Sequence, residues 1–187
     1  FDDVMQSIMK KRQAHRIVLP HQWPLLSPLL YLKPTRVLEF GLGGGSNLRF
    51  IMHFLPHVQY QVIESNKNVV DTSCMYFNTN QYRECITLCD AHDWLQDKHE
   101  IHADWIIYDI YQQPKFADVS LNHLLNTVIG KLKHNGYLSI NLPFVTLPEL
   151  TYWQEAILKA LPSHHLSTYR VPHYHNKVLV LRPKQDK

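Results

Sequence analysis

The chain is poor in cysteine and has no long apolar run. Its 187 residues include three cysteines, Cys74, Cys85 and Cys89, and no two of them form a Cys-x-x-Cys pair. This scarcity argues against a disulfide scaffold or a zinc ribbon and fits a reducing cytosol, so we expect a cytoplasmic protein. No apolar run approaches the ~20 residues that span a bilayer, and the chain does not open with a cationic segment followed by an apolar one. The sequence therefore predicts neither a membrane span nor a signal peptide.

Neither positive nor negative charge predominates strongly in the chain. The formal net charge is +3, and the basic residues are scattered along the chain rather than gathered in one segment. Such a balance gives no support for a nucleic-acid partner. Histidine is abundant, with thirteen residues, and four of them cluster at 164, 165, 173 and 175. No Asp, Glu or Cys completes a ligand set near that cluster, so we predict no metal site.

Glycine is scarce as well, but four of the six glycines stand together at positions 41, 43, 44 and 45. A strand-like run, 36–40, precedes them, and a helical pattern starts at Ser46. A glycine turn between a strand and a helix lets the backbone approach a ligand closely and points the first helical amides at it. The segment therefore predicts a site for a nucleotide-like cofactor.

Apolar strands and amphipathic helices alternate from residue 36 onward. The pattern predicts strands at 36–41, 59–64, 85–90, 104–110 and 136–142, and helices at 46–55, 67–78, 91–97 and 119–133. This alternation is typical of βαβ units around a buried parallel sheet. We expect Gly136 to stop the fourth helix and Pro148 to open a further helix that ends near Leu161.

The last part of the chain follows a different pattern. Two strand-like runs, 166–171 and 177–181, are joined by five residues, a connection that suits an antiparallel hairpin and not a parallel crossover. The predicted fold class is α/β, with a Rossmann-like, seven-stranded and mostly parallel sheet that ends in an antiparallel hairpin. We expect this domain to span 36–187 after an N-terminal helical or lid extension, 1–35. Within the extension, 2–13 is expected to form a short helix, and 21–32 is either a lid over the cofactor or a helix that covers one face of the sheet.

Three kinds of glycine loop are compatible with a strand, a turn and a helix. A P-loop requires Gly-Lys-Ser/Thr after the glycines, but Ser46 and Asn47 stand there. A dinucleotide loop places a small residue at its third glycine, where this chain has Ser46, so the match is imperfect and a dehydrogenase remains an alternative. The third kind, acidic-x-Gly-x-Gly-x-Gly, belongs to S-adenosylmethionine-dependent methyltransferases. Glu39, Gly41, Gly43 and Gly45 fit it without a gap.

Carboxylates at three successive strand ends support the third kind of loop. Glu39 can pair with the cationic amino group of such a cofactor, whereas it would repel a pyrophosphate. Glu64 can accept both ribose hydroxyls, and Asp90 can accept a hydrogen bond from the adenine amino group. The alternative for each acid is a helix cap. The predicted cofactor-binding residues are Glu39, Gly41, Leu42, Gly43, Gly45, Glu64, Ser65, Asp90 and Ala91.

The segment from Leu29 to Phe50, with its Gly-Leu-Gly-Gly-Gly-Ser core, resembles the spermidine synthase-like branch of the class I methyltransferase superfamily. The runs 62–64, 89–91 and 104–109 are similar to later motifs of the same branch, and the resemblance covers about residues 25 to 145. It implies the class I methyltransferase fold. It also implies a methyl or aminopropyl transferase that binds S-adenosylmethionine or its decarboxylated form.

The chain departs from that branch after the fourth strand. Spermidine synthases carry Asp-x-x-Asp-Pro there, with the first Asp as the proposed base and the second as a polyamine ligand. Asp109 matches the first acid, Gln112 replaces the second, and Pro114 comes one residue late. An amide cannot supply the negative charge that favours a buried ammonium. The family's N-terminal β-domain also has no counterpart in the 35 residues before the core, so the departures argue against polyamine synthesis.

The expected chemistry is an in-line displacement at a carbon on a sulfonium. The protein must align the two reactants and remove a proton from an amine or a hydroxyl. Asp109, at the end of the fourth strand, is the predicted catalytic base or orienting group, with a turn cap as the alternative. Tyr111, Gln112 and Asn141 are expected to lie on the acceptor side with it.

Three functions follow from these residues. The first is methyl transfer to a small-molecule acceptor, the second is aminopropyl transfer to a polyamine, and the third is a non-catalytic subunit that binds the cofactor. The absence of Asn/Asp-Pro-Pro-Tyr argues against methylation of a nucleobase amine. The sequence leaves a homodimer open.

Overall fold

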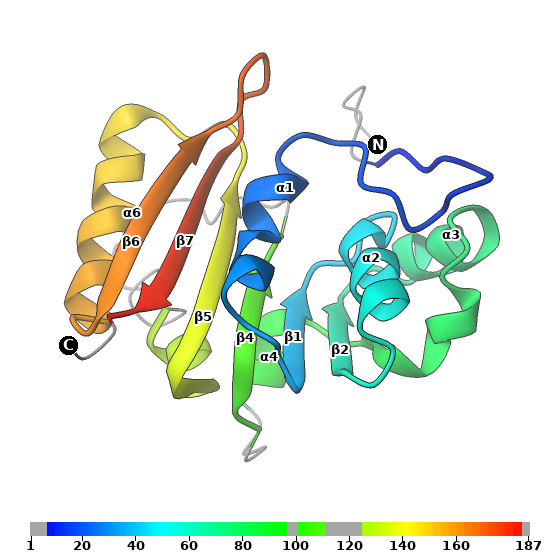
Figure 1. Ribbon diagram of the computed structural model, residues 1–187, viewed down its shortest axis with the longest axis horizontal. Helices are drawn as coiled ribbons and strands as arrows, with labels where there is room; N and C mark the ends of the chain where they lie inside the picture. The colour runs from blue at the N-terminus through cyan, green and yellow to red at the C-terminus, as the bar shows by residue number, and fades with distance from the viewer. Residues whose placement is uncertain (1–6, 97–100, 111–124, 185–187) are drawn as a thin grey trace.

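Seven strands form one mixed sheet in the computed structural model, which describes residues 7–96, 101–110 and 125–184 (Figure 1). The strands are β1 (Arg36–Phe40), β2 (Gln59–Glu64), β3 (Ile86–Leu88), β4 (Ala103–Tyr108), β5 (Leu132–Leu142), β6 (His164–Arg170) and β7 (Lys177–Pro183). Their order across the sheet is β3-β2-β1-β4-β5-β7-β6.

The direction of the strands agrees with the sequence-based prediction. Strands β1 to β5 pair in parallel, whereas β7 runs antiparallel to both β5 and β6. Strand β7 therefore lies between β5 and β6, with Asn141 opposite Val178 in the register. The predicted seven-stranded, mostly parallel sheet with an antiparallel pair at the end is confirmed.

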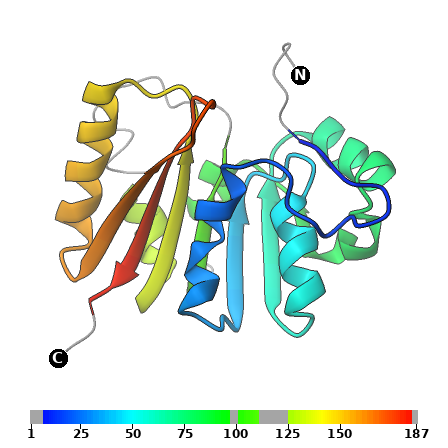
Figure 2. The ribbon, with the colours of Figure 1, turned by 45° about the horizontal axis from the view of Figure 1, so that its top comes forward.

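Helices cover the sheet on both faces (Figures 1 and 2). One face carries α1 (Gln22–Leu25), the 3₁₀ helix η1 (Ser27–Leu30), α2 (Ser46–Phe54) and α3 (Lys67–Tyr76), and the other face carries α4 (Ala91–Gln96), α6 (Leu147–Ala160) and a helix over 125–130. A second 3₁₀ helix, η2 (Asn80–Cys85), leads into β3. The chain is thus a three-layer α/β arrangement, as its alternating pattern predicts.

Alternate residues of the central strands supply the two cores. On β1, Val37 packs with α1, α2 and α3, whereas Leu38 and Phe40 pack with α4 and α6. The same alternation holds on β4, where Trp105 faces the first layer and Ile106 the second. Successive side chains of a strand point to opposite faces, so a strand covered on both sides is apolar throughout. Only Glu39 interrupts the buried apolar run 37–40, and it is 2% exposed.

The start of α6 follows directly from its sequence. The Thr146 hydroxyl accepts a hydrogen bond from the Glu149 amide, and the Glu149 carboxylate accepts one from the Thr146 amide, which makes a capping box. Pro148 stands in the first turn, where its missing amide hydrogen is not needed. The predicted helix start at Pro148 and its end near Leu161 are confirmed to within one residue.

The predicted helix stop at Gly136 is wrong. Gly136 does not stop a helix: the preceding helix ends at 130, and Gly136 lies inside β5, which begins at Leu132. The register explains the difference, because Ala103 pairs with Leu132 and Trp105 with Tyr137, so residues 133–136 of β5 lie opposite Asp104 alone. Long-range pairing with β4 sets this bulge, and a local stop signal does not reveal it.

The expected helix over 2–13 is also wrong for the residues that the structure describes. Residues 7–13 form no helix, and they run with the turns that follow them across α2 and α3 (Figures 1 and 2). A short polar helix is marginal in water without an apolar face to bury. Here the segment contacts the domain instead, and the Ser7 hydroxyl accepts a hydrogen bond from the Gly44 amide at 2.8 Å.

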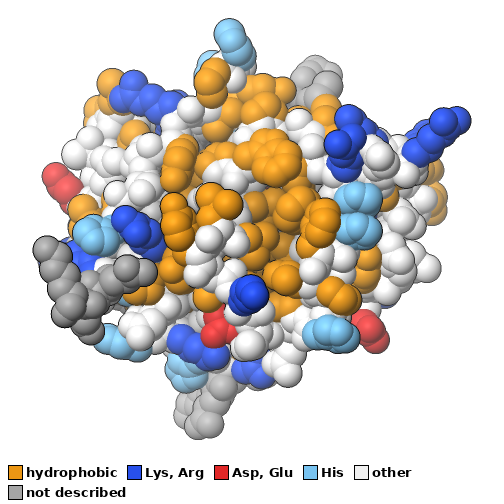
Figure 3. All heavy atoms as spheres, viewed as in Figure 1, with side chains coloured by type: hydrophobic (Ala, Val, Ile, Leu, Met, Phe, Trp, Pro, Cys, Tyr) orange, Lys and Arg blue, Asp and Glu red, His pale blue; other side chains and the backbone are white. Residues whose placement is uncertain are grey.

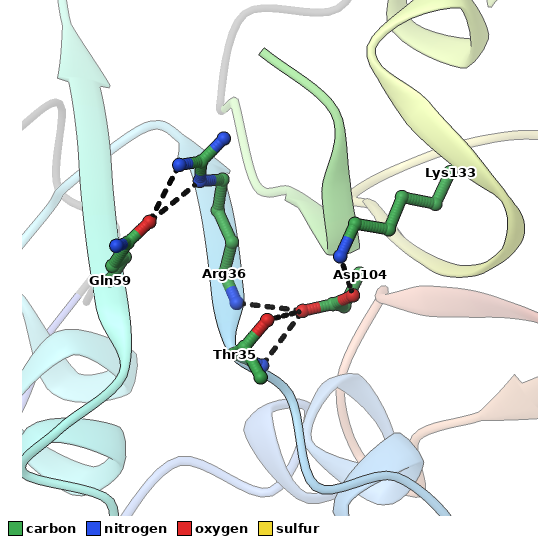
Figure 4. Close-up of polar contacts among 5 residues, drawn as sticks. All are labelled: Thr35, Arg36, Gln59, Asp104 and Lys133. Carbon is green, nitrogen blue, oxygen red and sulfur yellow. Dashed lines mark hydrogen bonds and ion pairs between the residues drawn. The ribbon is translucent and has the colours of Figure 1, made fainter.

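At the amino edge of the sheet, Asp104 joins three segments (Figure 4). Its carboxylate accepts hydrogen bonds from the amide and hydroxyl of Thr35, from the Arg36 amide and from the Lys133 amine, at 2.5–2.7 Å. Burial raises the pKa of this carboxyl, but these donors outweigh burial and lower it to about 2. The bulge in β5 has a role here, because it brings Lys133 to Asp104.

The face that carries α1 presents a gathering of hydrophobic side chains (Figure 3). Trp23, Leu30, Tyr31 and Phe54 are each more than half exposed, and the Phe50 ring meets Trp23 edge-on and Phe54 at a tilt. A homodimer stays a prediction.

No helix among the described residues is long and apolar enough to cross a membrane.

Candidate active site

The order of the strands reverses between β1 and β4, and the predicted site residues gather there. Strands to one side of this point are β1, β2 and β3, and to the other side β4 and β5. Crevices at such a switch point bind ligands at the carboxyl ends of the strands. Gly41 follows β1 and Asp109 follows β4, and a Cβ on Gly41 would collide with the Asp109 carbonyl. The glycine allows the two strand ends to lie in contact.

The glycine loop has the backbone that its sequence predicts. Gly41, Gly43 and Gly45 all have positive φ, and Gly45, at φ 66°, is the N-cap of α2. A side chain at Gly45 would also meet the Thr79 methyl group at 2.5 Å. Because this conformation is unfavourable for residues with a Cβ, the turn from β1 into α2 depends on glycine.

Glu64 holds the loop from the neighbouring strand. One of its carboxylate oxygens accepts a hydrogen bond from the Leu42 amide at 3.0 Å, and the other accepts one from the Asn66 amide at 2.8 Å. Its side chain is half-buried, and Ser65 beside it is exposed. The structure therefore brings Glu64, Ser65 and Leu42 together at the loop, and their role toward a ribose stays a prediction.

Glu39 lies beneath the loop rather than on its surface. Its two carboxylate oxygens accept hydrogen bonds from the Asn47 amide group at 2.8 Å and from the Tyr60 hydroxyl at 2.7 Å. Burial raises the pKa of Glu39 to about 8, although these two donors oppose the rise. Burial and the Glu39 carboxylate also raise the pKa of Tyr60. In the free protein near neutral pH, Glu39 is therefore largely uncharged.

One acceptor beside Glu39 is unused. The side-chain oxygen of Asn47 is buried and has no hydrogen-bond partner among the described residues. An unpaired buried polar atom costs free energy, and a ligand that donates to it removes that cost. Asn47 stands in the first turn of α2, directly after the glycine loop.

The residues present thus fit the amino-acid end of an adenosylmethionine-type cofactor. A buried carboxyl and an unpartnered amide oxygen are both acceptors, and an ammonium group offers three donors and a positive charge. A phosphate offers neither. Glu39 and Asn47 would hold the ammonium.

Asp90 and Ala91 mark the third strand end. Asp90 is exposed, and one of its oxygens accepts a hydrogen bond from the His92 amide at 2.7 Å, so it caps α4. Ala91, the first residue of α4, is half-buried. The capping alternative for Asp90 is therefore realised, and a contact from Asp90 to an adenine stays a prediction.

Asp109 and Asn141, both expected on the acceptor side, are in direct contact. The Asn141 amide group donates to the Asp109 carboxylate at 2.7 Å, and the Asn141 oxygen accepts from Asn176 at 2.9 Å. Asn141 is buried and Asp109 is half-buried. Because Asn176 directly precedes the antiparallel strand β7, the terminal hairpin orients the amide that orients Asp109.

Two of the predicted acceptor-side residues, Tyr111 and Gln112, lie outside the described residues. Tyr108, just before Asp109, is buried in the core between the sheet and α4. Burial raises the pKa of its hydroxyl to about 12, and the Asp90 charge adds to the rise. Tyr108 is thus a packing residue of the sheet.

Arg49 is a site residue that the sequence did not reveal. It is 2% exposed, and its guanidinium donates to the carbonyls of Gly44, Phe77 at 2.9 Å and Ala14 at 2.7 Å. Burial lowers the pKa of Arg49 to about 10. The side chain therefore ties the glycine loop to the end of α3 and to the N-terminal segment. The available signal was a basic residue within the run 48–52, whose other members are all apolar.

His21 and Asn47 were also missed. No sequence pattern marks the buried His21, and Asn47 matters through its contact with Glu39, eight residues earlier. The described residues contain no group of three or more His, Cys, Asp or Glu that could hold a metal ion.

Comparison with known proteins begins from sequence. No family model matches the chain. An eEF1A lysine and N-terminal methyltransferase of Danio rerio is 29% identical to it over 124 residues, which are 59% of this chain and 18% of that protein. The chain thus spans about a fifth of the length of the relative that it matches.

Solved structures show the fold. Human methyltransferase-like protein 13 in complex with SAH superposes with a TM-score of 0.72 at 19% identity, over 89% of this chain and 81% of that one. A probable spermidine synthase from Corynebacterium glutamicum superposes with a TM-score of 0.75 at 12% identity, over 94% of this chain and 67% of that one. The chain has the α/β Rossmann-like fold of the class I methyltransferases. Spermidine synthases share this fold, and the predicted resemblance to their branch is confirmed at that level.

Proposed function

We propose that the chain is an S-adenosylmethionine-dependent methyltransferase that acts on a small-molecule acceptor. The observation that carries the proposal is the buried pair of Glu39 and Asn47 under the glycine loop, with the Asn47 oxygen unpartnered among the described residues. These acceptors suit an ammonium group. When bound, S-adenosylmethionine supplies an electrophilic carbon on a sulfonium.

The raised pKa of Glu39 supports this choice of ligand over a dinucleotide. A cation that approaches a buried carboxyl favours its ionised form and lowers its pKa, whereas a pyrophosphate would raise that pKa further. Glu39, with a pKa of about 8 in the free protein, can release its proton when an ammonium binds near neutral pH. Binding of the proposed ligand therefore couples to proton release.

Asp109 is the proposed base or orienting group on the acceptor side. Its carboxylate lies at the end of β4, across the switch point from the loop, and Asn141 fixes one of its oxygens. A fixed carboxylate can hold an amine or a hydroxyl in line with the electrophilic carbon. The proposed substrate-side residues are Asp109, Asn141, Tyr111 and Gln112.

Aminopropyl transfer is the second candidate, because the fold is shared with a probable spermidine synthase. A decarboxylated cofactor keeps its ammonium, so the Glu39–Asn47 pair serves both reactions. Formation of spermidine from putrescine would establish this alternative. A third candidate, a non-catalytic subunit that binds the cofactor, would be rejected if Asp109→Asn abolished transfer by the purified chain.

Isothermal titration calorimetry with three ligands tests the proposal. S-adenosylhomocysteine carries the amino-acid end, methylthioadenosine lacks it, and NAD carries a pyrophosphate. We expect S-adenosylhomocysteine to bind most tightly and NAD not to bind. Binding of NAD alone would overturn the proposal.

Glu39→Gln sharpens the same experiment. The amide can still accept from Tyr60, but it carries no charge for an ammonium. Loss of a hydrogen bond to a charged group costs about 1.5–3 kcal/mol, so we expect the affinity for S-adenosylhomocysteine to fall about tenfold or more. Affinity for methylthioadenosine should stay within about threefold and serves as the control, because that ligand has no ammonium.

A further inference from the structure

His21 is a buried polar residue for which the proposed function gives no role. It precedes α1, and its ring nitrogen Nδ1 is buried without a hydrogen-bond partner among the described residues. Gln22, the next residue, is 6% exposed, and its side-chain oxygen is also unpartnered there. Two consecutive residues thus bury unused polar atoms, which points to a ligand that supplies the missing partner.

The position of α1 places these atoms at the acceptor side of the crevice. Helix α1 packs against β5 and β7, the strands that carry Asn141 and follow Asn176. The chain enters α1 at the carboxyl edge of β4 and β5, and then descends along the sheet (Figure 1). The residues before α1 therefore lie at the edge where Asp109 ends β4.

Electrostatics agree with this placement. Burial lowers the pKa of His21, and the Asp109 charge opposes the fall, so the two side chains lie within range of each other. The result is an imidazole that stays neutral near pH 7 beside a carboxylate. A neutral imidazole with a free nitrogen can accept a proton.

Other charges around α1 are engaged elsewhere. On β7, the Lys177 amine donates to the His175 carbonyl and Arg182 lies over the Tyr31 ring. On β5, Lys133 pairs with Asp104 at the far edge, and the His134 charge acts on His164. The 3₁₀ helix η1 has no charged residue. Asp109 is therefore the charge that governs the titration of His21 among the described residues.

We propose that His21 forms the acceptor side of the site together with Asp109, and that its Nδ1 takes the proton which the acceptor loses. The inference rests on the proposed function. As the carbon exchanges its bond to sulfur for a bond to the acceptor nitrogen or oxygen, the sulfur keeps the electron pair of the broken bond. The proton of the acceptor passes to His21, which becomes an imidazolium beside the Asp109 carboxylate. The acceptor class is an amine or a hydroxyl that must lose a proton as it is alkylated.

A titration of His21 by NMR tests this assignment without a known acceptor. Long-range ¹H–¹⁵N spectra report the protonation of each imidazole, and His21→Gln identifies the His21 signals. The ligands are S-adenosylhomocysteine, whose sulfur is neutral, and sinefungin, which carries an amine where the methylated sulfonium would stand. If His21 faces the transferred group, its pKa should be lower in the sinefungin complex by about one pH unit, because a nearby cation disfavours the imidazolium.

Two further variants complete the experiment. Asp109→Asn removes the charge that raises the pKa of His21, so the His21 pKa of the free protein should fall. His15→Gln is the matched control: His15 stacks on His53 at 3.8 Å, and losing it should leave the His21 titration unchanged. Calorimetry of His21→Gln should show affinities for both ligands within about threefold of the parent chain.

The outcomes separate the two proposals. Equal His21 pKa values in the two complexes, or no response to Asp109→Asn, would overturn the role of His21 while leaving cofactor binding intact. Failure of both ligands to bind the folded parent chain would overturn the proposed function, and the role of His21 with it.

Discussion

Two carboxylates on neighbouring strands of the sheet have opposite environments. Asp104, at the amino edge, accepts from four donors, and its pKa is lowered to about 2 (Figure 4). Glu39, under the glycine loop, accepts from two donors, and its burial raises the pKa to about 8. The amino edge is thus satisfied within the chain, whereas the carboxyl edge keeps unused acceptors and a costly charge. One edge stabilises the fold, and the other is arranged for a ligand.

The largest expected effect is on the pH dependence of stability through Glu39. Its folded pKa, about 8, lies above the ordinary value of 4.5, so the folded chain retains a proton that the unfolded chain has lost. The contribution of Glu39 to the free energy of unfolding is fully present below pH 4.5. It is lost as the pH rises through 8, at up to about 1.4 kcal/mol per pH unit.

Urea unfolding from pH 5 to 9 measures this effect as the difference between the parent chain and Glu39→Gln. The difference isolates Glu39 because the histidines with lowered pKa, such as His164, contribute with the opposite sign in both chains. The parent should lose stability relative to the variant as the pH rises. A constant difference across the range would show that Glu39 does not bind a proton in the folded state.

Arg49→Met is expected to lower the free energy of unfolding by a smaller but still large amount. The substitution keeps much of the buried volume but leaves the carbonyls of Gly44, Phe77 and Ala14 without their donor. Unsatisfied buried groups cost about 1–3 kcal/mol each, and water can reach some of them, so we expect a loss of about 3 kcal/mol. The affinity for S-adenosylhomocysteine should fall as well, because the loop loses its anchor.

Urea unfolding and calorimetry measure the two effects of Arg49→Met separately. Arg16→Met, a substitution of an exposed arginine that contacts Gln13, is the control and should change neither quantity. Normal affinity in a destabilised Arg49→Met variant would mean that the loop keeps its shape without the arginine.

The smallest of the three effects is expected at the amino edge. Asp104→Asn replaces two acceptor oxygens by one oxygen and one donor group, and should reduce stability at pH 7 by about 2 kcal/mol. Lys133→Met should cost less, about 0.5 kcal/mol, because the amine is half exposed and the backbone donors remain. Neither change should affect ligand affinity.

Acid unfolding provides the check for Asp104. Its stabilising contribution is present above the ordinary pKa of 3.8 and is lost as the pH falls through about 2, so the parent chain should approach the stability of Asp104→Asn in that window. Reduced ligand affinity in Asp104→Asn would contradict the separation of the two edges.

Local patterns made much of this architecture predictable. The strands, the glycine turn and the helix start at Pro148 depend on neighbours within a few residues, so the sequence reveals them. The acids Glu64 and Asp109 could be placed at strand ends because parallel strands bring those ends to one edge.

The remainder depends on contacts between distant parts of the chain. Gly136 looks like a helix stop until its strand pairs with β4 and forms a bulge. Arg49 joins residues 14, 44 and 77, and Asn176 reaches Asn141 from the terminal hairpin. No spacing in the sequence reveals such contacts.

The place of β7 in the sheet has a consequence for folding during synthesis. Strand β7 fills the gap between β5 and β6, yet it leaves the ribosome after both. Until it emerges, β5 has a bare, apolar edge, and β6 has no neighbour, which is a state prone to wrong pairing. The glycine loop is complete long before that moment, whereas Asp109 and Asn141 gain their last partner only then. The nascent chain can therefore acquire its cofactor half first and its acceptor half last.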